Sequence, residues 1–212
     1  ATGRQPDLAR LDPAAGGIRV SDRGVRVDAG LRSSNRRVHA VGDAAGGMQF
    51  THLANYHAGI VIRQVLFGLP AKVRTDHIPR VTYSDPELAQ IGQTEAEARK
   101  AHGTRLEVQR FPYAENDRAR ATAETDGFIK VMAVGGRPVG VTIVGAEAGE
   151  LVALWSVVLA NRLKLAAVAN MVAPYPTLGE IGKRAAGAYF APRLFENGMV
   201  KRVVGLVQRI LP

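Results

Sequence analysis

The sequence contains no cysteine, few aromatic residues and no long apolar run. Without cysteine the chain can form neither a disulfide nor a thiolate metal site, and we predict no metal-binding residues. No stretch approaches the roughly 20 apolar residues that cross a bilayer. The first six residues are polar and turn-like, unlike a signal peptide. We therefore expect a cytoplasmic protein.

Acidic residues are also scarce relative to basic ones. The sequence has 28 Lys and Arg residues and 19 Asp and Glu residues, which give a net charge of +9. Such a balance raises the hypothesis of a nucleic-acid partner. However, the arginines are spread along the chain, and the aromatic residues do not alternate with them as a base-stacking surface requires. We interpret the charge as a solvated basic surface and expect no nucleic-acid partner.

The most informative pattern lies near the middle of the first third of the chain. An apolar run, Val38–Val41, ends in Gly42 and Asp43, a glycine-rich loop follows, and a helical pattern opens near Thr51. A strand that delivers a carboxylate to a glycine loop in front of a helix N-terminus suits an electron-rich or anionic ligand, because unpaired N–H groups and the positive dipole end meet there. The same pattern fits an ordinary strand–loop–helix connection with Asp43 as a turn residue.

Four short blocks around this pattern carry a family resemblance: Val27-Asp28, Leu31-Arg32-Ser33-Ser34, Val38 to Asp43, and Phe50 to Ala54. They resemble the second FAD-contacting segment of the pyridine nucleotide–disulfide oxidoreductases, which include lipoamide dehydrogenase, glutathione reductase and mercuric reductase. The resemblance implies that the Asp43 carboxylate binds the ribityl chain of the flavin and that the backbone of Thr51 faces the pyrimidine edge. It also implies that Gly42, Phe50 and His52 line the site.

The resemblance further implies that the chain is the carboxy-terminal part of a longer enzyme. Residues 1–6 resemble the stretch that closes the family's NAD(P)-binding domain, and the sequence contains no Gly-x-Gly-x-x-Gly and no Cys-x-x-x-x-Cys motif. Residues 1–75 would then close an α/β FAD-binding domain and provide a partial FAD site, with NAD(P)H implied for the parent enzyme. In this segment we expect short strands at 24–28 and 38–42 and a helix at 51–67.

The remaining sequence, residues 76–212, predicts strands followed by helices. Thr94 and Glu97 form a capping box that starts a helix reaching about Ala101. Leucine, valine and Trp155 recur at helical spacing after Glu150. The other expected elements are two strands between Ile78 and Gly92 broken at Asp85-Pro86, strands 106–112 and 127–134, a hairpin turn at 135–138 returning through 139–145, and helices 165–171 and 180–189.

Residues 79–92 and 94–98 resemble the signature of the same family's dimerisation domain, Pro-x-x-x-x-Thr-Asp-Pro-Glu-x-Ala-x-Val-Gly-x-Thr-Glu-x-x-Ala. That resemblance implies an α+β fold, an antiparallel sheet flanked by helices, and a homodimer. Residues 76–212 would form this interface domain, with an amphipathic carboxy-terminal tail, behind the closing piece of the FAD-binding domain.

A third block, Ala173 to Glu180, resembles the family's His-Pro-Thr-x-x-Glu motif, in which the histidine serves the redox thiols of the other subunit and the glutamate orients it. This chain has Tyr175 at the place of the histidine and retains Glu180. A phenol, with a pKa of about 10, is a poor base at neutral pH but can donate a hydrogen bond. Tyr175 therefore has either a substrate-facing role or a packing role at a subunit interface. We also predict a cis Tyr175–Pro176 peptide.

These resemblances predict the carboxy-terminal part of a FAD-dependent NAD(P)H disulfide oxidoreductase, in which electrons pass from hydride to flavin, to a thiol pair, and to a small-molecule disulfide or other acceptor. Mercuric reductase also has tyrosine at the position of Tyr175, but its additional carboxy-terminal cysteines are absent here. The chain alone would be inactive and would work with upstream FAD and NAD(P) domains of the same protein. A non-catalytic dimerisation module and a basic membrane-surface binder are the alternatives.

The tail, residues 192–212, predicts an amphipathic helix. Its apolar face contains Met199, Val200, Val203, Val204, Val207, Ile210 and Leu211, and Lys201, Arg202, Gln208 and Arg209 lie elsewhere on the helix. A basic amphipathic helix can lie on a membrane surface, here through residues 196–212. It can also dock on its own domain or on a dimer partner.

Overall fold

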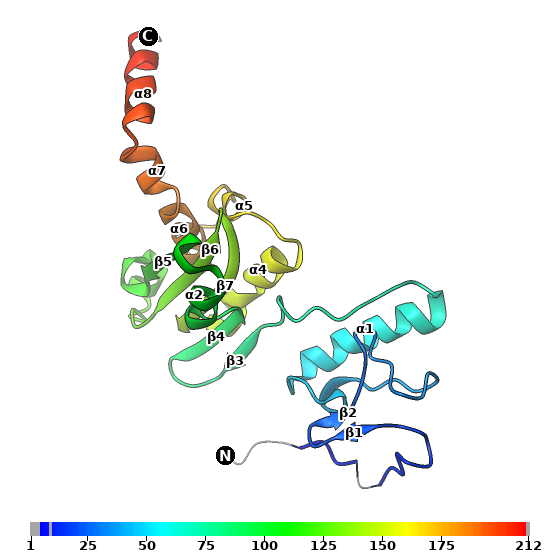
Figure 1. The fold of residues 1–212 in the computed structure, drawn as a ribbon. Helices are drawn as coiled ribbons and strands as arrows, with labels where there is room; N and C mark the ends of the chain where they lie inside the picture. Colours follow the sequence, from blue (N-terminus) through cyan, green and yellow to red (C-terminus); the bar gives the residue numbers. More distant parts are fainter. Residues whose placement is uncertain (1–4, 9, 211–212) are drawn as a thin grey trace. The chain divides into compact units, whose positions relative to one another are not determined.

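The computed structural model of the chain describes residues 5–8 and 10–210, which belong to two compact units, Ala1–Arg74 and Thr75–Pro212 (Figure 1). The first four residues of the predicted opening motif and Leu211 of the tail lie outside the described residues, as does the side chain of Ile210. Each unit has its own secondary structure and is described by itself.

The first unit is built around one long helix, α1 (Thr51–Phe67), which confirms the predicted bounds. The helix ends at Gly68, whose left-handed backbone (φ 62°) closes the last turn. Its buried side chains, Leu53, His57 and Ile60, recur at spacings of four and three residues and so lie on one face. A short hairpin of β1 (Val20–Ser21) and β2 (Gly24–Val25), together with the 3₁₀ helix η1 (Gly42–Ala45), completes the unit.

Two strands predicted in the first unit were wrong in extent. The strand expected at 24–28 is only β2, and the one expected at 38–42 is a single bridge between Arg32 and His39. Hydrogen bonds from Ser33 N–H to the Val38 carbonyl (2.9 Å) and from Ala40 N–H to the Leu31 carbonyl (3.1 Å) flank this bridge. A strand continues only as far as its neighbour runs alongside, and here the chain turns back within a few residues.

The second unit contains an antiparallel five-stranded sheet in the order β3-β4-β7-β6-β5, which confirms the predicted sheet. A two-residue turn, Gly135-Gly136, joins β6 to β7, and both glycines have positive φ (55° and 75°), as a type I′ hairpin requires. The strands are β3 (Arg80–Thr82), β4 (Glu87–Gly92), β5 (Leu106–Pro112), β6 (Phe128–Val134) and β7 (Arg137–Gly145).

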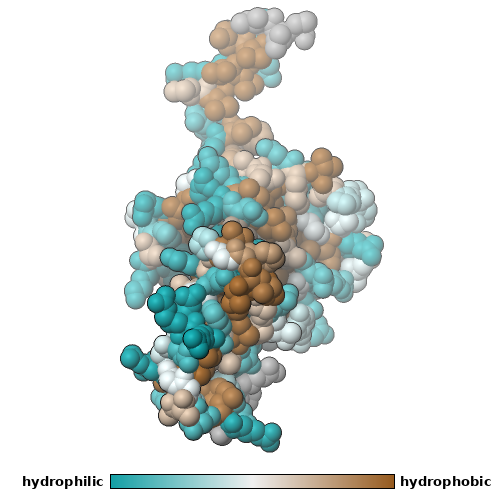
Figure 2. Space-filling view, turned by 90° about the vertical axis from the view of Figure 1, so that its right-hand side faces the viewer, coloured by the Kyte–Doolittle hydropathy of each residue, from teal (hydrophilic) through white to brown (hydrophobic). Residues whose placement is uncertain are grey.

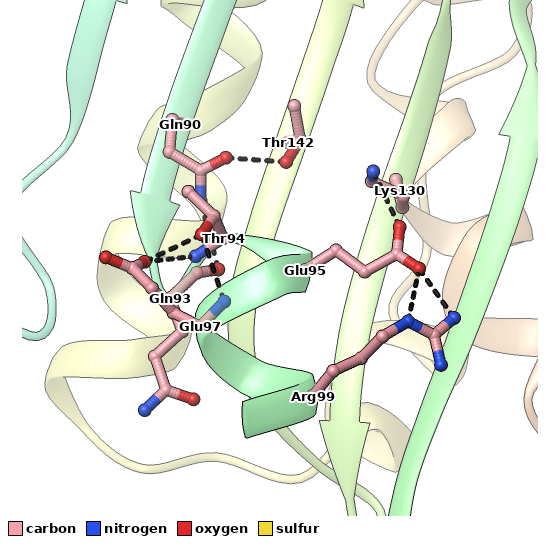
Figure 3. Close-up of polar contacts among 8 residues, drawn as sticks. All are labelled: Gln90, Gln93, Thr94, Glu95, Glu97, Arg99, Lys130 and Thr142. Carbon is pink, nitrogen blue, oxygen red and sulfur yellow. Dashed lines mark hydrogen bonds and ion pairs between the residues drawn. The ribbon is translucent and has the colours of Figure 1, made fainter. Parts of the chain in front are cut away.

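In the sequence, helices lie between some of the strands of this sheet and follow its last strand. Those longer than one turn are α2 (Glu95–His102), α3 (Asp117–Ala121), α4 (Ala148–Ala160), α5 (Leu165–Ala169), α6 (Glu180–Ala188), α7 (Ala191–Phe195) and α8 (Gly198–Ile210). The predicted capping box of α2 is confirmed, because Thr94 N–H donates to Glu97 Oε2 (2.8 Å) and Glu97 N–H donates to Thr94 Oγ1 (3.3 Å) (Figure 3). None of the helices formed by residues 5–8 and 10–210 is both long enough and apolar enough to cross a bilayer.

The larger hydrophobic core of the second unit lies on one face of the sheet, and a smaller buried cluster, Ala98, Leu106 and Met132, is separate from it. Two apolar rows cross the central strands in register, Ala89–Ile143–Ile129 and Ile91–Val141–Val131. All six side chains are fully buried, and they pack with Trp155 of α4 and Ile181 of α6. Successive residues of a strand point to opposite faces, so the residues between these rows form the other face of the sheet. α6 is thereby fixed on the apolar face, and Glu180 is its first residue.

Candidate functional site

The predicted cofactor residues begin in a tight turn at η1. Gly42 has φ 57°, and a Cβ at this position would lie 2.7 Å from the Cβ of Ala54 in α1, so only glycine allows helix and turn to approach this closely. At the other end of η1, Gly46 has φ 74° and donates its N–H to the Asp43 carbonyl (3.0 Å). Asp43, which is half-buried, is therefore held between two glycines that fix the turn.

The remaining predicted cofactor residues lie at the start of α1. Phe50 takes the N-cap position with an extended backbone and no capping side chain, and the first turn contains no acidic residue. The Phe50 and His52 rings stack with centroids 5.1 Å apart, on either side of Thr51. An N-terminus without a side-chain cap presents its N–H groups and positive dipole end to an electron-rich ligand. The structure thus brings Gly42 and Asp43 next to the turn that contains Phe50, Thr51 and His52.

A cavity of about 760 Å³ adjoins this turn. Of the five predicted cofactor residues, Phe50 lines it, and at Gly47 no atom lies within 4 Å of the place where a Cβ would stand. The full lining is Gln5, Pro6, Asp22, Arg23, Gly46, Gly47, Met48, Gln49 and Phe50. The carboxylate of Asp43 and the uncapped helix end fit a ligand with hydroxyl groups and an electron-rich ring edge, as a flavin has.

Sequence reasoning missed His57, which supports the turn from behind. Gly42 N–H donates to His57 Nδ1 (3.1 Å), and the histidine side chain is buried. Because Nδ1 accepts this bond, the ring is neutral and carries its proton on Nε2. Burial lowers the pKa of His57 below its usual 6.5. In the sequence His57 shows only helical spacing from Leu53, which is a packing signal.

This arrangement predicts that the first unit loses stability in mild acid. The folded-state pKa of His57 is below the unfolded value of 6.5, so the unfolded chain takes up the proton first. The contribution of His57 is therefore complete above about pH 6.5 and decreases as the pH falls below that value. An NMR titration of the His57 ring should give a pKa below 6.5. In His57→Gln, whose amide oxygen can accept the Gly42 bond without titrating, unfolding of the first unit should depend less on pH. A ring pKa at or above 6.5 would contradict the assignment.

The second predicted site lies in the loop between α5 and α6. The Tyr175–Pro176 peptide is cis, as predicted. The loop is held by two hydrogen bonds, from Thr177 Oγ1 to the Pro174 carbonyl (2.8 Å) and from Asn116 Nδ2 to the Thr177 carbonyl (3.1 Å). Asn116, which is fully buried, also accepts the Ala119 N–H (3.0 Å) and caps α3, a helix that the sequence did not predict.

Tyr175 and Glu180 are connected through two residues that sequence reasoning did not identify. Tyr175 Oη donates to Asp117 Oδ2 (3.0 Å), and Arg184 Nη2 lies 3.9 Å from the same oxygen. Arg184 Nη2 also pairs with Glu180 Oε1 (3.3 Å). The Arg184–Glu180 pair follows a spacing of four on a helix and was open to prediction. Asp117 is 58 positions from Tyr175 and no local pattern indicated it.

The hydrogen bond to Asp117 raises the pKa of Tyr175 above its usual value, chiefly because it holds the phenolic proton. The phenol is therefore protonated at neutral pH. Its side chain is 69% exposed in this chain. Tyr175 is thus fixed by Asp117 at its hydroxyl yet accessible from outside, while the pair Arg184–Glu180 keeps a positive and a negative charge beside it.

A further cavity of about 750 Å³ lies over the polar face of the sheet, beside α2. Residues Gln90, Thr142 and Lys130 form a row across β4, β7 and β6, and Thr142 Oγ1 donates to Gln90 Oε1 (2.5 Å). Glu95 of α2 binds both Lys130 Nζ (2.8 Å) and Arg99 Nη2 (2.6 Å), and these cations lower the pKa of Glu95 (Figure 3). The Glu95–Lys130 ion pair attaches α2 to the sheet. Because the charges of this cluster are paired with one another, we assign no ligand to it.

Comparison with known proteins gives a family match in the second unit and relatives along most of the chain. The model of the pyridine nucleotide-disulphide oxidoreductase dimerisation domain matches residues 78–186. A dihydrolipoyl dehydrogenase of Bacillus subtilis is 35% identical over 187 residues, which cover 87% of this chain and 39% of the relative. One of Trypanosoma brucei brucei is 35% identical over 193 residues, 89% of this chain and 40% of the relative. The chain spans about two fifths of the length of these relatives.

Solved structures show the same fold. The HOCl-induced flavoprotein disulfide reductase RclA of Escherichia coli superposes with a TM-score of 0.79 at 27% identity, over 88% of this chain and 44% of that one. LpdA of Mycobacterium tuberculosis superposes with a TM-score of 0.82 at 23% identity, over 88% of this chain and 41% of that one. At 23% identity the second likeness shows the fold alone.

Proposed function

This chain belongs to the pyridine nucleotide-disulphide oxidoreductase family, and from that premise we propose that it is the carboxy-terminal part of a FAD-dependent, NAD(P)H-linked disulfide oxidoreductase. In this proposal residues 1–75 close the FAD-binding domain and residues 76–212 form the dimerisation domain. The parent protein would be a cytoplasmic homodimer that contains upstream FAD and NAD(P) domains and reduces a small-molecule disulfide or another electron acceptor. The relatives named dihydrolipoyl dehydrogenase and flavoprotein disulfide reductase support this class of activity.

The observation that carries the proposal is the turn at Gly42 and Asp43 in front of the uncapped end of α1. Asp43 would accept hydrogen bonds from the ribityl hydroxyls, and the backbone of Thr51 would face the pyrimidine edge of the ring. Phe50 and His52 would line the same place, with His57 holding Gly42 in position. When bound, the flavin supplies an acceptor for two electrons from a nicotinamide.

Replacing Asp43 by asparagine should weaken flavin binding about 10- to 100-fold, because a hydrogen bond to a charged group contributes about 1.5 to 3 kcal/mol. The measurement is FAD affinity and visible flavin absorbance in a version extended at its amino terminus to the length of the relatives. Asp126→Asn, at an exposed carboxylate of the second unit, is the matched control and should bind FAD like the parent.

The same absorbance measurement, made on this chain and on the extended version, also tests the alternative of a dimerisation module without a redox role. We expect flavin in the extended version and weak or no retention in this chain, which provides only part of the site. Absence of flavin from the extended protein, or equal affinity in Asp43→Asn and Asp126→Asn, would refute the proposed site.

We further propose that Tyr175 and Glu180 contribute to the active site of the partner subunit. Asp117 raises the pKa of Tyr175 and so excludes it as a general base at neutral pH. Its O–H already donates a hydrogen bond to Asp117, and its oxygen can still accept a hydrogen bond from a substrate or thiol. The exposure of Tyr175 and the charge pair beside it support such a contact.

In the intact enzyme, Tyr175→Phe should slow electron transfer to substrate roughly 5- to 10-fold, since one hydrogen bond contributes about 1 kcal/mol. Flavin reduction by NAD(P)H should be unchanged, and stopped-flow measurement of the two half-reactions separates these effects. In Asp117→Asn the pKa of Tyr175 should fall towards its usual value, which moves the alkaline limit of the substrate step to lower pH. Equal loss in both half-reactions of Tyr175→Phe would count against this role.

A further inference from the structure

Helix α8 presents an apolar arc that is exposed in the structure. At 100° per residue, this arc covers about 160° of the helix surface. Its members are Met199, Val200, Val203, Val204, Leu206 and Val207. Met199 is 75% exposed, Leu206 59% and Val203 55%. Figure 2 shows hydrophobic surface on the segment that leads to the carboxy terminus. The sequence left open that this arc docks on the chain's own domain. In the structure the arc is exposed and does not dock there.

Only positive charges accompany the apolar arc. The basic flanks of α8 are Lys201, Arg202 and Arg209, which are exposed, and the sequence from Asn197 to Ile210 contains no Asp or Glu. By helical position, Arg202 and Arg209 lie beyond the Leu206 edge of the arc, and Lys201 lies beyond its Val204 edge. Long basic side chains at the edges of an apolar arc can cover it with their stems and extend their charges towards phosphate groups.

The helix also needs a surface to cover it. A helix of 13 residues is marginal in water by itself, and four valines and two glycines lower its intrinsic propensity further. Asn197 caps it, since its Oδ1 accepts the Met199 N–H (2.9 Å). One cap does not compensate for an exposed apolar arc, so burial of that arc has to supply the remaining stability.

The start of the tail is attached to the second unit. Arg193 of α7 pairs with Glu107 of β5 (2.5 Å), and its guanidinium lies 3.9 Å from the centre of the Tyr189 ring. These contacts fix α7 at its middle, while Leu194 and Phe195, which follow, are 55% and 71% exposed. The apolar surface of α8 therefore continues from a segment that is anchored on the domain.

We propose that α8 lies in the plane of a membrane surface containing anionic lipid. The apolar arc would enter the boundary between headgroups and acyl chains, and the basic flanks would contact lipid phosphates. The positive charges of the helix complement the negative charges of anionic lipid, because every charged side chain on the helix is basic. The arc between them is wide, aliphatic and without a polar interruption, which suits the acyl chains. The anchored α7 would hold the second unit next to the surface. This surface site does not depend on the flavin site.

The test uses the full chain with vesicles of phosphatidylcholine alone or mixed with phosphatidylserine, followed by flotation. We expect binding to the mixed vesicles, weaker binding to phosphatidylcholine, and a decrease with added salt. Leu206→Asp should abolish binding by placing a carboxylate in the apolar arc. Replacing Lys201, Arg202 and Arg209 by glutamine should weaken binding by roughly fivefold per charge. Replacing Lys100, Arg105 and Lys164 by glutamine removes the same charge from other exposed positions and should leave binding nearly unchanged.

Thermal unfolding of each variant establishes that the domain is still folded when binding is lost. Equal weakening in the two triple variants, or no binding to mixed vesicles by the parent chain, would overturn the proposal. So would sedimentation that shows a concentration-dependent association sensitive to Leu206→Asp without vesicle binding, because a second copy of the chain would then cover the apolar arc.

Discussion

Replacing Trp155 by alanine is expected to lower the free energy of unfolding of the second unit by about 3 to 5 kcal/mol. Trp155 is 1% exposed and lies between the sheet and the helices on its apolar face. Its ring contacts the start of α6, where a Cβ at Gly182 would lie 3.7 Å from Trp155 Nε1. A cavity of about 210 Å³ already adjoins this contact, so removing the indole enlarges an existing void.

The matched control for this change is Val157→Ala. Val157 is on the same helix but is 56% exposed, so its truncation should change stability by less than about 0.5 kcal/mol. Chemical denaturation followed by far-ultraviolet circular dichroism compares both variants with the parent chain. Similar losses for the two would mean that Trp155 does not hold α6 on the sheet. A large loss at Trp155 alone would indicate that α6, whose first residue is Glu180, depends on this contact for its place on the sheet.

Replacing Gly140 by alanine is the second change with a large expected effect, a loss of about 3 kcal/mol or more. A Cβ at Gly140 would overlap the carbonyl oxygen of Gln93 and lie 2.8 Å from its backbone nitrogen. Both groups are backbone and cannot rotate away. The crowding follows from the local structure: β6 and β7 change register beside Gly140, and Gln93 N–H donates to the Val139 carbonyl (3.0 Å) where β4 ends.

Gly187 provides the comparison for this substitution. It lies in α6, and no atom is within 4 Å of the place where its Cβ would stand. Gly187→Ala should therefore stabilise the unit by about 0.5 to 1 kcal/mol, because alanine has the higher helix propensity. The chain contains one tryptophan, which is buried in this unit, so its fluorescence reports unfolding in both variants. Equal stability of Gly140→Ala and the parent would show that β4 and β7 can separate here without cost.

Elements determined by local pattern were predicted from the sequence. The helix at 51–67, the capping box at Thr94, the hairpin at Gly135-Gly136 and the cis peptide at Tyr175 each depend on a few neighbouring residues, and each is confirmed. The short bridge at Arg32 and His39 replaced a predicted strand, because strand length depends on a neighbour that the apolar pattern does not specify.

Contacts between residues distant in the sequence were not open to this kind of prediction. The hydrogen bond from Tyr175 to Asp117 spans 58 positions. The hydrogen bond from Gly42 N–H goes to His57, whose spacing in the sequence predicts only a buried packing residue. The assignment of Asp43 and Thr51 as flavin contacts came from the family resemblance together with a local pattern. The structure brings these residues together, and their role in binding stays a prediction.

The buried amide of Asn116 restricts which amino acids the chain can use at that position. Its oxygen accepts the Ala119 N–H and its nitrogen donates to the Thr177 carbonyl, so one side chain serves α3 and the Tyr175 loop at the same time. Aspartate has the same shape and caps helices equally well, but it has no donor for Thr177 and would oppose a carboxylate to a carbonyl oxygen. Serine and threonine are too short to reach both partners. The neighbouring Asp117, which accepts the hydrogen bond from Tyr175 Oη, is therefore held in place next to a residue that few others can replace.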